Sequence, residues 1–177
     1  MSFFCLRMKI IHPLPLNQEN FQPFGKVISF AHLDHYPINQ GTTERYHAIS
    51  EIDVGDGDSK AIISLFRGQP FVMPFTLRLM ERHPLGTQTF IPTNNQTNDQ
   101  YLIVVSKPNL ESEADVVNNL CAFIASNGAG ITYNKGVWHH PLISLNKESD
   151  FIVIDRASMQ NNCDEIQLSQ QVIINNP

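Results

Sequence analysis

The sequence predicts a mainly β protein, folded as a barrel or a double-sheet jelly roll with one or two short helices. Short apolar runs rich in Val, Ile, Phe and Thr recur along the chain, each bounded by Gly, Pro, Asn or Asp, which is typical of strands. The 11 prolines fall at the edges of these runs and argue against long helices. Many short strands within 177 residues favour one barrel or two facing sheets.

The strands are expected at the apolar runs that carry β-branched or aromatic side chains. Their lengths, between three and six residues, suit strands better than helices. A strand-like segment, Lys9 to Ile11, also follows Met8. The seven clearest runs are residues 61–66, 75–80, 87–91, 101–105, 131–133, 137–139 and 151–154.

Two short helices are expected. Residues 17–22 can form one or two turns, capped by Asn17 and ended by Pro23 and Gly25. Residues 113–120 are the second candidate, because three apolar side chains fall on one side of that helix. Neither segment is long enough to dominate the fold.

The chain is expected to form one domain. Residues 1–7 are predicted to be a flexible N-terminal extension, and residues 8–177 a single β-domain, since no Pro- or Gly-rich linker divides them. Residues 55–58 and 93–100 are polar and are predicted to be loops.

Composition excludes several classes of function. The net charge of -5 and pI near 5.7 argue against a nucleic-acid-binding surface, which needs a basic stripe. No run approaches the roughly 20 apolar residues of a membrane-spanning helix. Three widely spaced cysteines form no paired framework, and the N-terminus is too short and too weakly apolar for a secretory signal. A cytoplasmic location is therefore expected, with neither nucleic acid nor membrane as partner.

Candidate chemistry lies in three segments with unusual densities of His, Arg and Glu. Four of the seven histidines fall within them, although a single histidine in a β-domain is more often structural than a ligand. The segments are residues 44–47 (ERYH), 81–88 (ERHPLGTQ) and 136–141 (GVWHHP).

The period of a strand predicts which of these side chains meet. Glu81 and His83 are two residues apart and would share a face, roughly 7 Å apart along the strand. Gln88 lies beyond a Pro-Leu-Gly turn and can return to the same cavity. His139 and His140 are adjacent and should face opposite sides, so only one of them is expected to line an interior site.

Arg67 is a candidate anion ligand. It closes the apolar run at residues 62–66, where the rim of a barrel would bring it near a cavity mouth. An ordinary surface role is an equal alternative for Arg67. For Arg82, between Glu81 and His83, an exposed or salt-bridged side chain is at least as good an explanation.

Taken together, these segments resemble the ureidoglycolate lyase family, the cupin-type enzymes of allantoin breakdown. The resemblance runs in order from about residue 8 to residue 166, and ERHPLGTQ and VWHHPL are long, unusual strings. Residues 1–7, the polar loop at 93–100 and Gly68, where Ala is common, depart from the family pattern. The segments that carry the resemblance are residues 44–47, 63–70, 81–92, 134–142, 155–156 and 162–164.

The resemblance implies a cupin-like β-barrel and a specific reaction. The implied activity is cleavage of (S)-ureidoglycolate to glyoxylate and urea in allantoin and purine nitrogen catabolism. It also implies a homodimer. Two alternatives remain open: an amidohydrolase that releases ammonia from the same substrate, and a non-catalytic cupin that binds small carboxylates.

The resemblance further implies a metal site, because the family is described with nickel. The second cupin motif, Gly-x5-Pro-x-Gly-x2-His, is matched by Gly128, Gly136 and His139, with Asn134 in the place of proline. The implied ligands are a mixture of nitrogen and oxygen donors, which suits Ni, Mn or Fe. An enzyme without a metal stays an alternative. Carried over position by position, the implied ligands are Glu81, His83, Gln88 and His139.

The implied substrate sets what the site must supply. Ureidoglycolate carries a carboxylate, so the site needs a cationic anchor, and bidentate arginine suits it. Arg67 and Arg45 are the candidates, with His47 and Gln88 as further substrate contacts.

Lysis also requires removal of the hydroxyl proton and protonation of the departing nitrogen. His and Glu are the usual residues for such transfers. His139 or His83 is expected to act as the base and Glu81 as the acid.

Overall fold

The computed structural model describes residues 8–31, 33–94 and 99–176. The expected N-terminal extension, residues 1–7, lies outside the described residues, as does the centre of the 93–100 loop. Among the described residues, no helix has the length and apolar content needed to cross a bilayer.

Strands make up most of the described chain, and the helices are short. The mainly β prediction with one or two short helices is confirmed. The elements within the described residues are β1 (Lys9–Ile11), β2 (Leu14–Pro15), α1 (Gln18–Phe21), β3 (Gly25–Ile28), β4 (Tyr36–Ile38), the 3-10 helix η1 (Asn39–Gly41), β5 (Thr43–Arg45), β6 (Lys60–Gly68), β7 (Phe75–Arg82), β8 (Gln88–Pro92), β9 (Gln100–Ser106), α2 (Glu113–Asn118), β10 (Cys121–Ala125), β11 (Gly130–Tyr133), β12 (Trp138–His139), β13 (Ile143–Leu145), β14 (Ser149–Ala157) and β15 (Asp164–Ile174).

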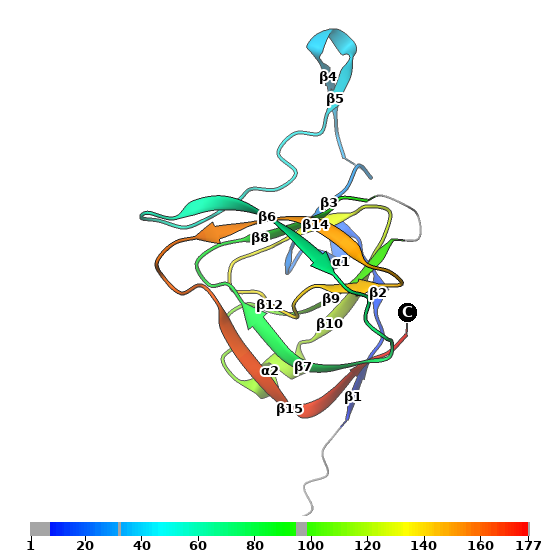
Figure 1. Ribbon diagram of the computed structural model, residues 1–177, viewed down its shortest axis with the longest axis vertical. Coiled ribbons are helices and arrows are strands. Elements are labelled where there is room, and N and C mark those ends of the chain that lie inside the picture. Colours follow the sequence, from blue (N-terminus) through cyan, green and yellow to red (C-terminus); the bar gives the residue numbers. More distant parts are fainter. Residues whose placement is uncertain (1–7, 32, 95–98, 177) are drawn as a thin grey trace, which may run out of the picture.

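Two larger sheets form two layers, as in a cupin-like fold (Figure 1). The first sheet has the strand order β1-β15-β7-β12-β9-β10-β2, with β13 added beside β9. The second has the order β3-β11-β8-β14-β6. Its edge strand β6 lies on the upper side of the body of the fold in Figure 1, below β4 and β5, and β7 and β15 lie in the opposite layer.

The core between the layers follows from the alternation of side chains along each strand. On β14, Phe151 and Val153 are fully buried, whereas Ile152 and Ile154 are only half-buried on the outer face. Phe90 from the neighbouring β8 packs against Phe151 at a centroid distance of 6.4 Å. The burial of the side chains therefore shows which face of these strands points into the core.

Both predicted helices form, with caps that explain where they begin. The Asn17 side chain accepts a hydrogen bond from the backbone N–H of Asn20, and the Asn20 side chain accepts one from the N–H of Asn17. This places Phe21 in the core with no exposed surface. Helix α2 is capped by Ser112, whose hydroxyl accepts from the N–H of Asp115.

A two-stranded hairpin stands away from the body of the fold. Strands β4 and β5 pair only with each other in this arm, which we define as residues 35–47 (Figure 1). Tyr46 stacks on His35 at 4.9 Å and contacts Phe30 edge-on at 5.0 Å. The sequence analysis did not predict this arm.

Candidate active site

Glu81, His83 and His139 meet at the inner surface of the first sheet. Glu81 lies opposite His139 where β7 pairs with β12, and His83 directly follows β7. The Glu81 Oε1 atom is 3.4 Å from His139 Nε2 and 4.0 Å from His83 Nε2. The two imidazole rings are 5.1 Å apart between centroids. Three side chains named from the sequence are therefore brought together.

Backbone carbonyls fix the tautomer of both histidines. His83 Nδ1 lies 2.6 Å from the carbonyl oxygen of Asn162, and His139 Nδ1 lies 2.9 Å from that of Val137. Because a carbonyl only accepts, each Nδ1 carries the proton, so a neutral ring at either position would keep its lone pair on Nε2. Both Nε2 atoms are buried and have no hydrogen-bond partner among the described residues.

His139 is the most enclosed member of the cluster. It is 1% exposed, and its ring stacks on Tyr133 at 4.3 Å with an interplanar angle of 16°. Burial raises the pKa of Tyr133, so its ring stays neutral beside the imidazole. This stacking holds the His139 ring in one orientation.

The electrostatics of the cluster favour an ionised Glu81 and a neutral His83. Burial by itself raises the pKa of Glu81, but the contact with His139 and the nearby His83 lower it more, leaving the pKa below its ordinary value. Burial and then the neighbouring His139 lower the pKa of His83. Glu81 is thus a carboxylate at neutral pH, which suits a ligand or proton acceptor better than the acid we expected.

An open cavity of about 310 Å³ adjoins the cluster and is large enough for a small organic acid. His83 and Gln88 line it, so Gln88 returns to the site across the turn, as predicted from the sequence. Asp155 and Arg156 from β14 also line it. Gln88 Oε1 and Asp155 Oδ1 are buried, with no hydrogen-bond partner among the described residues.

Asp155 was not singled out from the sequence, and Arg156 was only a reserve candidate for the cationic anchor. Asp155 continues the inward positions of Phe151 and Val153, so the strand period alone could have identified it. For Arg156 the signal was its place in a segment that carries the family resemblance. Its guanidinium donates to the Val54 carbonyl and to two polar side chains after β14.

Arg67 lies elsewhere on the second sheet. Its guanidinium makes two hydrogen bonds to Asp150, of 2.7 and 2.8 Å, and an ion pair with Glu148. Its side chain is 64% exposed. Asp150 precedes Asp155 by five residues on β14, which corresponds to roughly 17 Å of strand. Arg67 is therefore not brought to the cluster.

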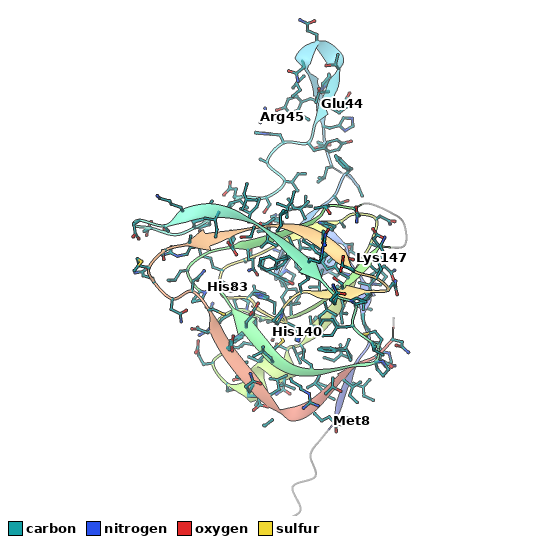
Figure 2. All side chains as sticks on the ribbon, viewed as in Figure 1. Met8, Glu44, Arg45, His83, His140 and Lys147 are labelled. Atoms are coloured by element: carbon teal, nitrogen blue, oxygen red, sulfur yellow. The ribbon has the colours of Figure 1, made fainter. Side chains whose placement is uncertain are left out.

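Arg45 and His47 belong to the arm. Figure 2 shows Arg45 and Glu44 on the arm, well apart from His83 in the body of the fold. His47 contacts Tyr36 of the same arm, at 6.4 Å between ring centroids. The chain thus brings neither residue to its own cluster in this conformation.

His140 follows the end of β12 and lines a hollow of about 10 Å³ with Tyr133, the ring that stacks on His139. The His140 ring lies 5.0 Å from Phe75, and burial lowers its pKa. Only His139 of this pair joins Glu81 and His83.

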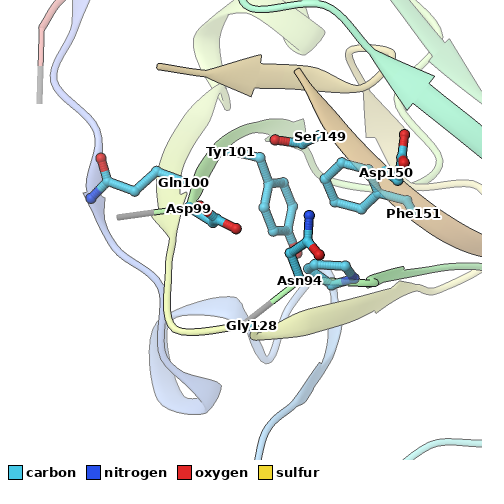
Figure 3. Close-up of a pocket in the computed structure, with 9 residues that line it drawn as sticks. Asn94, Asp99, Gln100, Tyr101, Gly128, Ser149, Asp150 and Phe151 are labelled. Atoms are coloured by element: carbon cyan, nitrogen blue, oxygen red, sulfur yellow. The ribbon is translucent and has the colours of Figure 1, made fainter. Parts of the chain in front are cut away.

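Another hollow, lined by Tyr101 and Phe151 among others, is a poor alternative site (Figure 3). Its volume is about 10 Å³, room for little more than one water. Its carboxylates are already paired, Asp99 with Lys147 and Asp150 with Arg67.

The donor set of the cluster fits a divalent metal ion. The ligand atoms of Glu81, His83 and His139 all lie within 4.8 Å of one another. Two imidazoles and one carboxylate form a known set for non-haem iron, and imidazole also suits nickel and zinc. The two buried Nε2 lone pairs have no other partner among the described residues, which a cation would satisfy.

Comparisons with known proteins agree on one family. Residues 8–175 match the family model described as ureidoglycolate lyase. A ureidoglycolate lyase from Pseudomonas putida strain W619 is 42% identical over 164 residues, covering 92% of this chain and 95% of that relative. One from Burkholderia cepacia is 46% identical over 153 residues, covering 86% and 83%. One from Pseudomonas syringae pv. tomato is 42% identical over 151 residues, covering 85% of each.

Proposed function

The chain belongs to the ureidoglycolate lyase family, and from that premise we propose that it cleaves (S)-ureidoglycolate to glyoxylate and urea. We place this reaction in the cytoplasm, as a step of allantoin and purine nitrogen catabolism. The observation that carries the proposal is the meeting of Glu81, His83 and His139 beside a cavity of about 310 Å³. No feature of this site favours an amidohydrolase or a non-catalytic binding domain.

The reaction breaks the bond between the central carbon and the ureido nitrogen. The hydroxyl on that carbon loses a proton, its electrons form the carbonyl of glyoxylate, and the departing nitrogen gains a proton. The site therefore has to remove one proton and return one. Side chains that transfer protons typically contribute a hundred- to ten-thousand-fold each.

The three clustered side chains can serve this reaction with or without a metal. We favour Glu81, His83 and His139 as ligands of a divalent ion, nickel being the family's cofactor by resemblance. When bound, such an ion would supply a Lewis acid toward the carboxylate and hydroxyl of the substrate. Without it, the neutral His83 at the cavity would accept the hydroxyl proton and return it to the nitrogen.

A cation is needed for the carboxylate of the substrate, and we propose Arg156. It lines the cavity, and its Nε atom is buried without a hydrogen-bond partner among the described residues. Arg67 is a weaker candidate because two carboxylates already hold it. Arg45 and His47 could contact the substrate only if the arm closed over the cavity of its own chain or over that of a second copy.

We also propose that residues 8–177 act as one domain and that two copies associate. The outer face of the edge strand β6 exposes Ile63 and Leu65, at 74% and 78% of their surface. Long exposed edge strands of this kind readily pair with another chain. Light scattering of wild type and Leu65→Asp tests this, and a wild type that is monomeric at micromolar concentration would refute it.

The nitrogen product tests the proposed activity directly. Purified protein is incubated with (S)-ureidoglycolate, and urea and ammonia are measured separately against the spontaneous rate. Stoichiometric urea with glyoxylate is the expected result. Ammonia would instead establish an amidohydrolase, and absence of turnover with retained glyoxylate binding would establish a non-catalytic binding domain.

A further inference from the structure

Two unsatisfied hydrogen-bond acceptors face the cavity and are not used by the reaction as proposed. Asp155 Oδ1 and Gln88 Oε1 are both buried without a hydrogen-bond partner among the described residues, and both side chains line the cavity. Gln88 is 7% exposed. Buried acceptors left unpaired destabilise a fold, so such atoms mark a place where a ligand donates.

The neighbouring groups do not satisfy Asp155. Arg156, its neighbour in sequence, donates to Val54, Ser158 and Gln160 rather than to Asp155. His83 turns its Nδ1–H to the carbonyl of Asn162. Asp155 therefore keeps an unpaired acceptor beside the cavity, as Gln88 does.

The ureido group of the substrate is the part that needs acceptors. It carries three N–H donors, two on the terminal nitrogen and one on the nitrogen that leaves. We propose that Asp155 and Gln88 form a subsite that accepts hydrogen bonds from these N–H groups. This inference rests on the proposed function and names the residues that bind the ureido end of the substrate.

Such a subsite determines specificity. A site built to pair polar groups rejects an analogue that lacks them, because its own buried groups are left unpaired. An analogue in which a methyl group replaces the terminal NH₂ keeps the carboxylate, the hydroxyl and the bond that breaks. It would leave an acceptor of the subsite, and Asp155 above all, without a donor.

The test compares (S)-ureidoglycolate with that N-acetyl analogue in wild type and in Asp155→Leu. Wild type is expected to prefer ureidoglycolate at least a hundredfold in kcat/KM, and Asp155→Leu less than tenfold. Asp56→Leu, in an exposed turn, serves as the control and should keep the wild-type preference. An equal loss on both substrates would overturn the subsite, because it would show a positioning role through His83.

Urea binding gives a second readout that does not depend on turnover or on the leucine variant folding. Urea is expected to bind wild type, and Asp155→Asn at least tenfold more weakly, by calorimetry. Equal binding of urea to both proteins would overturn the subsite. If wild type bound urea through Asp155 but did not turn over ureidoglycolate, the proposed function would fail while the subsite stood.

Discussion

His139 lies directly across from Glu81 where β12 pairs with β7, with its Nε2 atom 3.4 Å from the carboxylate. The contact is set by strand register, because β12 has only two residues and β7 holds it on one side and β9 on the other. A shift of one residue would turn His139 to the opposite face of the sheet. The chemistry of the site thus depends on correct pairing of sequence-distant strands.

Removing either histidine should abolish most of the activity. His83→Ala and His139→Ala are each expected to lower kcat/KM at least a hundredfold, since each loses a buried Nε2 lone pair. His140→Gln is the control, because His140 is not one of the three clustered ligand residues; it should change kcat/KM less than about fivefold. Steady-state kinetics with circular dichroism for folding would check this. Near-wild-type rates in both alanine variants would remove the site assignment.

The cluster is expected to bind one divalent ion per chain. Metal analysis of purified protein should find about one equivalent, and a chelator should lower activity until a metal is restored. Glu81→Gln and His139→Ala should each lose the metal, whereas Glu19→Gln, at an exposed position of α1 outside the possible ligand groups, should keep it. Full activity in protein shown to be metal-free would instead favour His83 as the base.

Replacing Arg156 and replacing Arg67 should have different effects on KM. Arg156→Gln is expected to raise KM at least tenfold, because it removes the cation that lines the cavity. Arg67→Gln should change KM less than threefold, since Asp150 and Glu148 hold that guanidinium away from the cluster. The opposite ranking would return Arg67 to the substrate site.

Acid should destabilise the metal-free protein. Burial lowers the pKa of His83 and of His140, so between the folded and unfolded values the unfolded chain binds more protons. The free energy of unfolding then falls as the pH drops below the ordinary histidine value of about 6.5. Urea denaturation at pH 7 and pH 5 would show it, with a smaller fall in His140→Gln. A flat profile over that range would contradict the prediction.

Core and cap variants test the energetic basis of α1. Phe21→Ala should cost about 3–5 kcal/mol of unfolding free energy, because its ring is fully buried against Phe123 and Tyr133. Asn17→Ala should cost about 0.5–2 kcal/mol through loss of the cap. Chemical denaturation measures both, and an equal cost would contradict this account of the helix.

Local pattern was sufficient for much of the fold. The strand period placed Glu81 and His83 on one face and predicted that only one of the two adjacent histidines joins them, because those relations depend only on neighbours in sequence. Strand β15 was missed although its burial alternates along eleven residues. Its Gln and Ser side chains weaken the apolar signal, and its pairing with β7 lies more than eighty residues away.

The positions of the arginines could not be predicted in the same way. Arg67 is held by Asp150 and Glu148, which reach it only because β14 pairs with β6 in the register observed. Arg156 enters the cavity wall through contacts with residues a hundred positions earlier. Both depend on long-range register, which composition and spacing do not reveal.

Gly86, buried in the turn between β7 and β8, lies tightly against Arg156, a residue of the cavity wall. A β-carbon there would lie 2.9 Å from the β-carbon of Arg156, closer than two carbon atoms can approach. Even alanine would have to push Arg156 outward, together with the segment that its guanidinium holds. The absence of a single methyl group at Gly86 therefore lets this part of the cavity wall keep its position.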